Sequence, residues 1–174
     1  IRDGEEDFDL DGLSNESEIS NYGTNPRLED TDGDKLHDGF EVNTSNTNPL
    51  SDDSDGDGLN DGDEVRVLET HPSIADSDGN GINDGDEDSD SDGLTDSDEI
   101  NIYKTKPRDS DSDKDRLSDG DEVKHGLDPL SQDTDKDGVN DGNEDLDEDG
   151  LSNALELNIH LTDPKEADSD RDGI

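Results

Sequence analysis

The chain has 174 residues and a formal net charge of −43, and only 21% of its residues are hydrophobic and 2% aromatic. Burial of so little apolar surface cannot offset the conformational entropy that the chain loses on folding. Something other than an apolar core must therefore supply the folding free energy. The absence of cysteine excludes disulfides, thiolate metal sites and thiol catalysis. The charge argues against nucleic-acid binding, and no apolar run reaches membrane-spanning length.

One twelve-residue pattern, D-x-D-x-[DN]-x-[LIV]-x-[DN]-x-x-E, repeats along the chain. It occurs in full at residues 7–18, 30–41, 53–64, 76–87, 88–99, 111–122, 133–144 and 145–156. Residues 1–6 fit the end of another copy, and residues 168–174 fit the beginning of one more. We therefore expect a single repeat array over residues 1–174, truncated at both ends and cut from a longer protein.

Spacers of ten or eleven residues follow most copies and resemble E-[IVL]-x-x-x-x-T-x-P, where E closes the preceding copy. The copies 76–87 and 133–144 have no spacer, and the next copy follows them directly. Proline stands eight residues or fewer after each spacer's glutamate, which limits any helix there to about two turns. All six prolines lie in these spacers: Pro26, Pro49, Pro72, Pro107, Pro129 and Pro164.

The pattern places oxygen ligands at the spacing that a calcium loop requires. Calcium takes six to eight oxygen ligands, and a twelve-residue loop can supply them from positions 1, 3, 5, 7, 9 and 12, with the main-chain carbonyl acting at position 7. The side-chain positions hold carboxylates except at Asn15, Asn80 and Asn153, whose amide oxygens can also coordinate. Ligands that are all oxygen and flexible favour calcium over magnesium. We predict that the chain binds about eight or more calcium ions.

The predicted metal ligands share these loop positions. Position 1 holds Asp7, Asp30, Asp53, Asp76, Asp88, Asp111, Asp133 and Asp145, and position 3 holds Asp9, Asp32, Asp55, Asp78, Asp90, Asp113, Asp135 and Asp147. Position 5 holds Asp11, Asp34, Asp57, Asn80, Asp92, Asp115, Asp137 and Asp149, and position 7 holds Leu13, Leu36, Leu59, Ile82, Leu94, Leu117, Val139 and Leu151. Position 9 holds Asn15, Asp38, Asp61, Asp84, Asp96, Asp119, Asp141 and Asn153, and position 12 holds Glu18, Glu41, Glu64, Glu87, Glu99, Glu122, Glu144 and Glu156. The partial sites hold Asp3, Glu6, Asp168, Asp170 and Asp172.

Position 6 must turn sharply, and glycine stands there in most copies. Lys35 and Arg116 are the exceptions among the complete copies. A left-handed conformation costs a residue with a Cβ atom about 1–2 kcal/mol. We therefore expect these two loops to bind calcium more weakly or to turn differently.

The apolar residue at position 7 distinguishes the pattern from an EF-hand, in which the apolar residue of the loop is at position 8. The short spacers also leave no room for the flanking helices of paired EF-hands, and the same features count against a dockerin. The phrases D-S-D-G-D-G-L-N-D-G-D-E and E-I-S-N-Y-G-T-N-P, together with the alternating spacings, resemble bacterial thrombospondin type 3 repeats. The resemblance implies calcium-wrapped loops in stalks or linkers of secreted and cell-surface proteins. The animal members carry disulfides between repeats, which this chain lacks.

The expected fold is therefore mostly irregular: calcium-stabilised loop repeats in an elongated rod, with short helical turns and no central hydrophobic core. We expect no enzymatic activity, because a chain without a core offers no cleft that separates carboxylate pKa values. The histidines His37, His71, His125 and His160 hold no constant repeat position, and we expect them at the surface.

The leading hypothesis is an extracellular or cell-surface stalk or spacer, rigidified by calcium, whose partners are calcium and adjoining domains of the same parent chain. It involves neither nucleic acid nor membrane insertion by this segment. The alternatives are a calcium-dependent adhesion module that binds a receptor, a glycan or a neighbouring chain, and a calcium buffer or mineral-nucleating polyanion without a compact fold.

Overall fold

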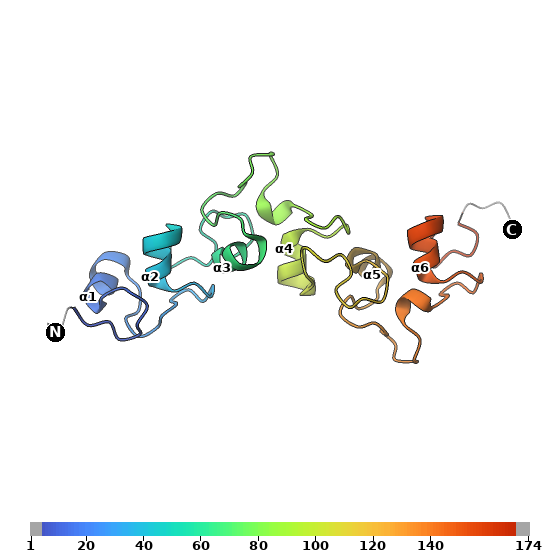
Figure 1. The fold of residues 1–174 in the computed structure, drawn as a ribbon, viewed down its shortest axis with the longest axis horizontal. Helices are drawn as coiled ribbons and strands as arrows, with labels where there is room; N and C mark the ends of the chain where they lie inside the picture. The colour runs from blue at the N-terminus through green and yellow to red at the C-terminus, as the bar shows by residue number, and fades with distance from the viewer. Residues whose placement is uncertain (1–4, 170–174) are drawn as a thin grey trace. The chain divides into compact units, whose positions relative to one another are not determined.

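The computed structural model describes residues 5–169, and within them the chain is mostly irregular, with short helical turns and no strand (Figure 1). Of the predicted partial-site ligands, Asp3, Asp170 and Asp172 lie outside this range. The chain divides into two compact units, Ile1–Glu87 and Asp88–Ile174. The division falls where one loop follows another without a spacer.

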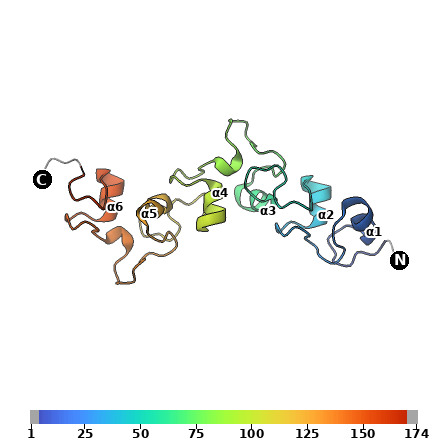
Figure 2. The same cartoon turned by 180° about the vertical axis from the view of Figure 1, so that it is seen from behind.

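Each loop leads into a helical turn that begins at loop position 9. In the first unit, α1 (Asn15–Ser17) continues into η2 (Glu18–Tyr22), α2 (Asp38–Phe40) into η3 (Glu41–Ser45), and α3 (Asp61–Asp63) into η4 (Glu64–Leu68), and η5 (Asp84–Asp86) stands alone. In the second unit, α4 (Asp96–Asp98) continues into η6 (Glu99–Tyr103), α5 (Asp119–His125) and η7 (Asp141–Asn143) stand alone, and α6 (Asn153–Leu155) continues into η8 (Glu156–His160). Figure 2 shows the same turns from behind.

The ends of these turns follow from local sequence. Position 8 is extended and serves as the N-cap, and the hydroxyl oxygens of Ser14 and Ser118 accept hydrogen bonds from main-chain N–H groups of the first turn. Acidic residues in the first turn complement the positive end of the helix dipole. A left-handed residue, such as Gly23 or Gly126, then ends the turn before the proline segment. The predicted limit of about two turns is confirmed.

The loops fall into two classes. We call six of them closed loops, because a spacer with a seven- or eight-residue helical turn follows each: 7–18, 30–41, 53–64, 88–99, 111–122 and 145–156. The open loops, 76–87 and 133–144, end in the single 3₁₀ turns η5 and η7, and Glu87 and Glu144 are already extended. The closed loops alone therefore cover their final glutamate with a helical turn.

Apolar packing is confined to single leucines and spacer prolines. Position 7 is buried in five closed loops, at Leu13, Leu36, Leu59, Leu94 and Leu117, and the other buried apolar side chains in residues 5–169 are Leu68 and the spacer prolines Pro49, Pro72, Pro107, Pro129 and Pro164. In the open loops, Ile82 is 50% exposed and Val139 is 40% exposed. The structure thus has no central apolar core in its described part, as the composition predicts.

Candidate metal centres

Each loop curls around its position-1 carboxylate, which accepts hydrogen bonds from main-chain N–H groups later in the same loop. In the first loop, Asp7 Oδ1 accepts a hydrogen bond from the Leu10 N–H at 2.7 Å, and Asp7 Oδ2 accepts one from the Gly12 N–H at 3.3 Å. The position-5 carboxylate acts in the same way on the position-7 N–H, with Asp11 Oδ1 lying 2.7 Å from the Leu13 nitrogen. These bonds curl the loop so that the carboxylates converge.

Two left-handed residues make this curl possible. Position 6 has a positive φ, 103° at Gly12, and Lys35 and Arg116 adopt the same kind of turn with φ of 81° and 90°. These two loops therefore do not turn differently; whether they bind calcium more weakly stays a prediction. Position 4 is left-handed in all eight loops, which the sequence reasoning missed, although glycine stands there in three of them.

The curled loops bring carboxylates together in two kinds of cluster. Within a loop, positions 1, 3 and 5 converge, so that one oxygen of each lies within 4.8 Å of the others in Asp7–Asp9–Asp11 and in Asp30–Asp32–Asp34. A second cluster combines positions 5 and 12 of one loop with position 9 of the next. It is formed by Asp11, Glu18 and Asp38, and again by Asp34, Glu41 and Asp61. Sequence reasoning missed this second cluster, because it joins residues from different repeats.

The position-12 glutamates are the most deeply buried charges. Glu18, Glu41, Glu64, Glu99, Glu122 and Glu156, which end the closed loops, are all 0% exposed. Burial, followed by repulsion from the aspartates at positions 3 and 5, raises the pKa of Glu41 to about 8 and that of Glu64 to about 9. The corresponding glutamates of the open loops, Glu87 and Glu144, are half-buried. The closed loops therefore hold negative charges that water does not stabilise.

The buried carboxylate oxygens lack hydrogen-bond donors in a consistent pattern. One or both oxygens have no partner at position 3 in Asp9, Asp32, Asp55, Asp90, Asp113 and Asp147 and at position 12 in Glu18, Glu41, Glu64, Glu99, Glu122 and Glu156, and single oxygens of Asp34, Asp84 and Asp119 are also unpartnered. Burying a charge without a partner is strongly unfavourable. These oxygens, all from predicted ligand positions, form the donor set that a hard cation such as calcium requires.

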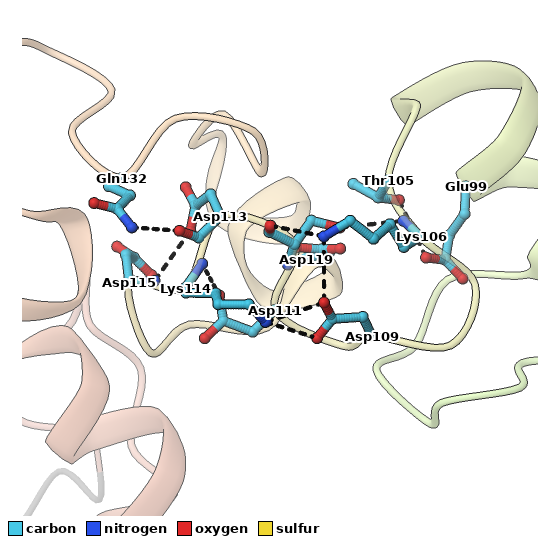
Figure 3. Close-up of polar contacts among 11 residues, drawn as sticks. Glu99, Thr105, Lys106, Asp109, Asp111, Asp113, Lys114, Asp115, Asp119 and Gln132 are labelled. Atoms are coloured by element: carbon cyan, nitrogen blue, oxygen red, sulfur yellow. Dashed lines mark hydrogen bonds and ion pairs between the residues drawn. The ribbon is translucent and has the colours of Figure 1, made fainter.

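Three lysines near the loops form ion pairs with aspartates outside the ligand positions. In loop 111–122, Lys106 and Lys114 form ion pairs with Asp109 at 3.2 and 3.1 Å, and Asp109 lies outside the ligand positions (Figure 3). Lys35 likewise pairs with Asp63, at loop position 11, at 2.7 Å.

A spacer threonine holds one oxygen of the position-12 glutamate. The Thr105 hydroxyl donates to Glu99 Oε1 at 3.1 Å, as Figure 3 shows, and Thr47 donates to Glu41 Oε1 at the same distance. Thr24, Thr70 and Thr162 make the equivalent contact in three other closed loops. The other oxygen, Oε2, is left facing the cluster. Sequence reasoning placed this threonine in the path of the chain and missed its contact with the glutamate.

Position 9 is held by residues that precede it. Asp38 accepts hydrogen bonds from the Thr31 N–H at 2.7 Å and from the Thr31 hydroxyl at 2.6 Å, and the same hydroxyl accepts one from the Asn25 N–H of the spacer at 3.0 Å. All six loops with aspartate at position 9 have Ser or Thr at position 2. This network places Asp38 against the cluster of the preceding loop. That Asp38 also binds the ion of its own loop stays a prediction.

The two loops with asparagine at position 9 lack the Ser or Thr at position 2. They have Phe8 and Leu146 there, and neither side chain carries a hydroxyl. The Asn153 Oδ1 accepts a hydrogen bond from the Leu146 N–H at 3.3 Å, and its Nδ2 donates to the Asp141 carbonyl at 2.7 Å. The amide therefore ties loop 145–156 to the loop before it, in addition to any role as a ligand.

The histidines include one exception to the surface prediction. His125 is only 7% exposed, because its Nδ1 lies 2.7 Å from the Asp121 carbonyl at the end of α5 and Lys165 Nζ donates to its main-chain carbonyl at 2.6 Å. The prediction was wrong for this residue because the later spacer packs over it. No helix in the described part of the chain is long and apolar enough to cross a membrane.

Comparison with known families gives one match. The family described as "Bacterial TSP3 repeat" matches residues 7–26, 30–51, 53–70, 88–107, 111–132 and 145–167, which make up more than half of the chain. The matched segments are the six closed loops with all or part of their spacers, and both open loops lie outside them.

Comparison with other proteins gives short matches. No curated protein matches the chain. A solved structure described as "Biofilm associated protein - B domain" is 41% identical over 26% of this chain and 11% of that chain, with a TM-score of 0.26. Another, "Biofilm associated protein - BSP domain", is 46% identical over 25% of this chain and 7% of that chain, with a TM-score of 0.25. The chain thus spans a small part of the length of these two proteins.

Proposed function

The chain belongs to the bacterial TSP3 repeat family, a family of calcium-binding repeats. From this premise we propose that the chain is a stalk or spacer of a larger secreted or cell-surface protein and that calcium makes it rigid. Extracellular calcium modules work with dissociation constants of about 10⁻⁴–10⁻³ M, so calcium outside cells would keep such loops filled. The adjoining domains of the parent chain are its proposed partners.

The observation that carries the proposal is the set of buried, unpartnered carboxylate oxygens at positions 3 and 12. In a closed loop such as 30–41, calcium would be held by Asp30, Asp32, Asp34, Glu41 and the Leu36 carbonyl. The cluster of Asp34, Glu41 and Asp61 offers a second place for an ion between loops. Bound calcium supplies the positive charge that makes burial of these carboxylates favourable. The full ligand assignment of the eight loops, and the number of ions, belong to this proposal.

Small-angle scattering of the 174-residue chain, with calcium and with a chelator, tests the proposal. We expect a random-coil profile in the chelator and a narrow rod profile in calcium, because binding and folding are coupled when the ligands repel one another. A random-coil profile that calcium leaves unchanged would refute the proposal and favour a simple calcium buffer.

Deletion of one whole repeat distinguishes a spacer from a recognition module. Removing residues 30–52 brings loop 53–64 into the place of loop 30–41 without changing the spacing of the remaining loops. A spacer should lose length in proportion and keep the function of the parent protein. If the parent protein loses its binding on this deletion but keeps it when residues 53–75 are removed, recognition by a particular repeat is the better explanation.

A further inference from the structure

The position-5 aspartate of one loop reaches the next loop in the chain. Its Oδ2 accepts a hydrogen bond from the N–H of position 10 in the following loop, at 2.9 Å from Asp11 to Gly39 and at 3.2 Å from Asp57 to Gly85. The pairs Asp92–Gly120 and Asp115–Gly142 repeat the contact at 3.0 and 2.8 Å. The Oδ1 of the same aspartates is bonded to the position-7 N–H of their own loop. One carboxylate thus bridges two loops at these four joints, whereas Asp34 Oδ2, which faces the fifth such glycine, Gly62, in sequence, has no hydrogen-bond partner.

The contact requires glycine at position 10. A Cβ atom on Gly62 would lie 1.9 Å from the main-chain oxygen of Asp34, and one on Gly85 would lie 2.5 Å from that of Asp57. Because the obstructing atoms belong to the main chain, they cannot move aside as a flexible side chain could. No side chain larger than hydrogen fits while the two loops are docked in this way.

The residue at position 10 depends on what precedes the loop in the sequence. The five loops that follow a closed loop across a spacer have Gly39, Gly62, Gly85, Gly120 and Gly142. The first complete loop and the two loops that follow an open loop have Glu16, Ser97 and Ala154 instead. At the second of these joints, the contact is made by the Asn153 amide on the Asp141 carbonyl and does not involve a position-5 carboxylate.

The open loops also lack the outgoing half of the contact. Asn80, at position 5 of loop 76–87, turns its Nδ2 toward its own loop and donates to Glu87 Oε1 at 2.6 Å. In loop 133–144, Asp137 holds its own Val139 N–H at 2.8 Å, and the next loop presents Ala154 at position 10. The sequence therefore offers no pair of position-5 aspartate and position-10 glycine after either open loop.

We propose that the position-5 aspartate and the position-10 glycine couple calcium binding between the consecutive loops that they join. They join loop 7–18 to loop 30–41, loop 53–64 to loop 76–87, loop 88–99 to loop 111–122, and loop 111–122 to loop 133–144. The proposal rests on the calcium binding proposed above. An ion in one loop would fix the carboxylate that bridges to the next loop, as Asp11 does, and would thereby help to place Asp38 in the cluster between the loops.

The test is a calcium titration of the 174-residue chain carrying Gly39→Ala, which would place a Cβ atom 2.2 Å from the main-chain oxygen of Asp11, followed by calorimetry and equilibrium dialysis. We expect the calcium bound at saturation to be retained, whereas the titration becomes less steep and the midpoint for loops 7–18 and 30–41 rises on the order of fivefold or more, a usual size for coupling between sites. Glu16→Ala changes position 10 in a loop without the contact and is the matched control, which should titrate like the unmodified chain. Ala154→Gly should do the same.

A Gly39→Ala titration as steep as that of Glu16→Ala would overturn the coupling and leave the calcium sites themselves in place. If the unmodified chain binds no calcium in dialysis, the proposed function fails as well, so the two failures are distinguishable. Should Gly39→Ala not fold, the unmodified chain provides the measurement by nuclear magnetic resonance. Coupling predicts one calcium midpoint for the amides of Leu59, Gly81 and Gly85, whereas a Gly85 midpoint that follows Gly81 and differs from that of Leu59 would contradict it.

Discussion

At the scale of single residues, the closed loops depend on buried glutamates whose two oxygens have different surroundings. In Glu41, Oε1 accepts a hydrogen bond from Thr47 and Oε2 has no donor. Glu122 is the exception, because the shortened spacer places Leu127 where the others have threonine, and both of its oxygens are unpartnered. The threonine therefore orients the glutamate, and it also favours the charged form that a cation binds.

The first prediction concerns this threonine. Thr47→Val removes the hydroxyl that lowers the pKa of Glu41, so protons compete better for the carboxylate and calcium affinity of loop 30–41 should fall several-fold, in line with about 1–3 kcal/mol for a buried acceptor left without its donor. Thr44→Val changes an exposed threonine of the same spacer and serves as the control. Calorimetric titration measures both variants, and equal affinities would show that the hydroxyl does not act on the site.

At the scale of elements, the helical turns explain how two spacer lengths produce the same joint. Turns of the longer spacers pass from α into π geometry, as in η2, where the Gly23 N–H donates to the Glu18 carbonyl five residues earlier at 2.7 Å. The ten-residue spacer instead carries α5, a continuous α-helix of seven residues. A π turn contains one more residue than an α turn, so it fits one additional residue between the same two end points. The change from π to α thus absorbs the missing residue, and the Asp115–Gly142 contact is kept.

The second prediction follows from this exchange. Deleting Thr44 from η3 should convert the turn to a shape like that of α5 and leave the chain folded in calcium, with the same number of ions bound. Deleting Ser54 from loop 53–64 removes one residue as well, but it shifts every later ligand of that loop and should abolish its binding. Equilibrium dialysis compares the two deletions. Equal losses of calcium would mean that the turn does not absorb a change in length.

The ligand loops could be predicted from sequence because their residues lie within twelve positions of one another and repeat in register. Leu36, for example, follows Asp34 by two residues and its N–H bonds to that same carboxylate, so the local spacing already contains the contact. The contact of Asp57 with Gly85 joins residues 28 positions apart. Only the alternation of Gly with Glu16, Ser97 and Ala154 at position 10 could have indicated it.

At the scale of the whole molecule, the clustered carboxylates make the metal-free chain sensitive to pH. Burial and neighbouring aspartates raise the pKa of Glu18 to about 7, that of Glu99 to about 8 and that of Glu122 to about 9. A glutamate in an expanded chain has a pKa of about 4.3. The compact state therefore binds protons more tightly than the expanded state, and its advantage is present at low pH and is lost as the pH rises through about 7–9.

The third prediction is that acid partly replaces calcium. In a chelator, lowering the pH from 9 to 6 should reduce the hydrodynamic radius of the chain, because the closed-loop glutamates become neutral and no longer repel the aspartates. In saturating calcium the same change should have a much smaller effect. Dynamic light scattering measures both series. A metal-free radius that does not change over this range would show that the buried carboxylates do not control compaction.

The aspartate-to-glycine contact also bears on how such chains can change in length over evolution. Loop 111–122 carries both halves of the joint, an outgoing aspartate at position 5 and an incoming glycine at position 10, in Asp115 and Gly120. A gene duplication that copies one closed loop with its spacer therefore creates two new borders that already fit, without compensating mutations. A copied open loop brings no outgoing contact. Tandem duplication should thus lengthen these arrays in multiples of about 23 residues, and open loops should mark where one lineage of copies ends.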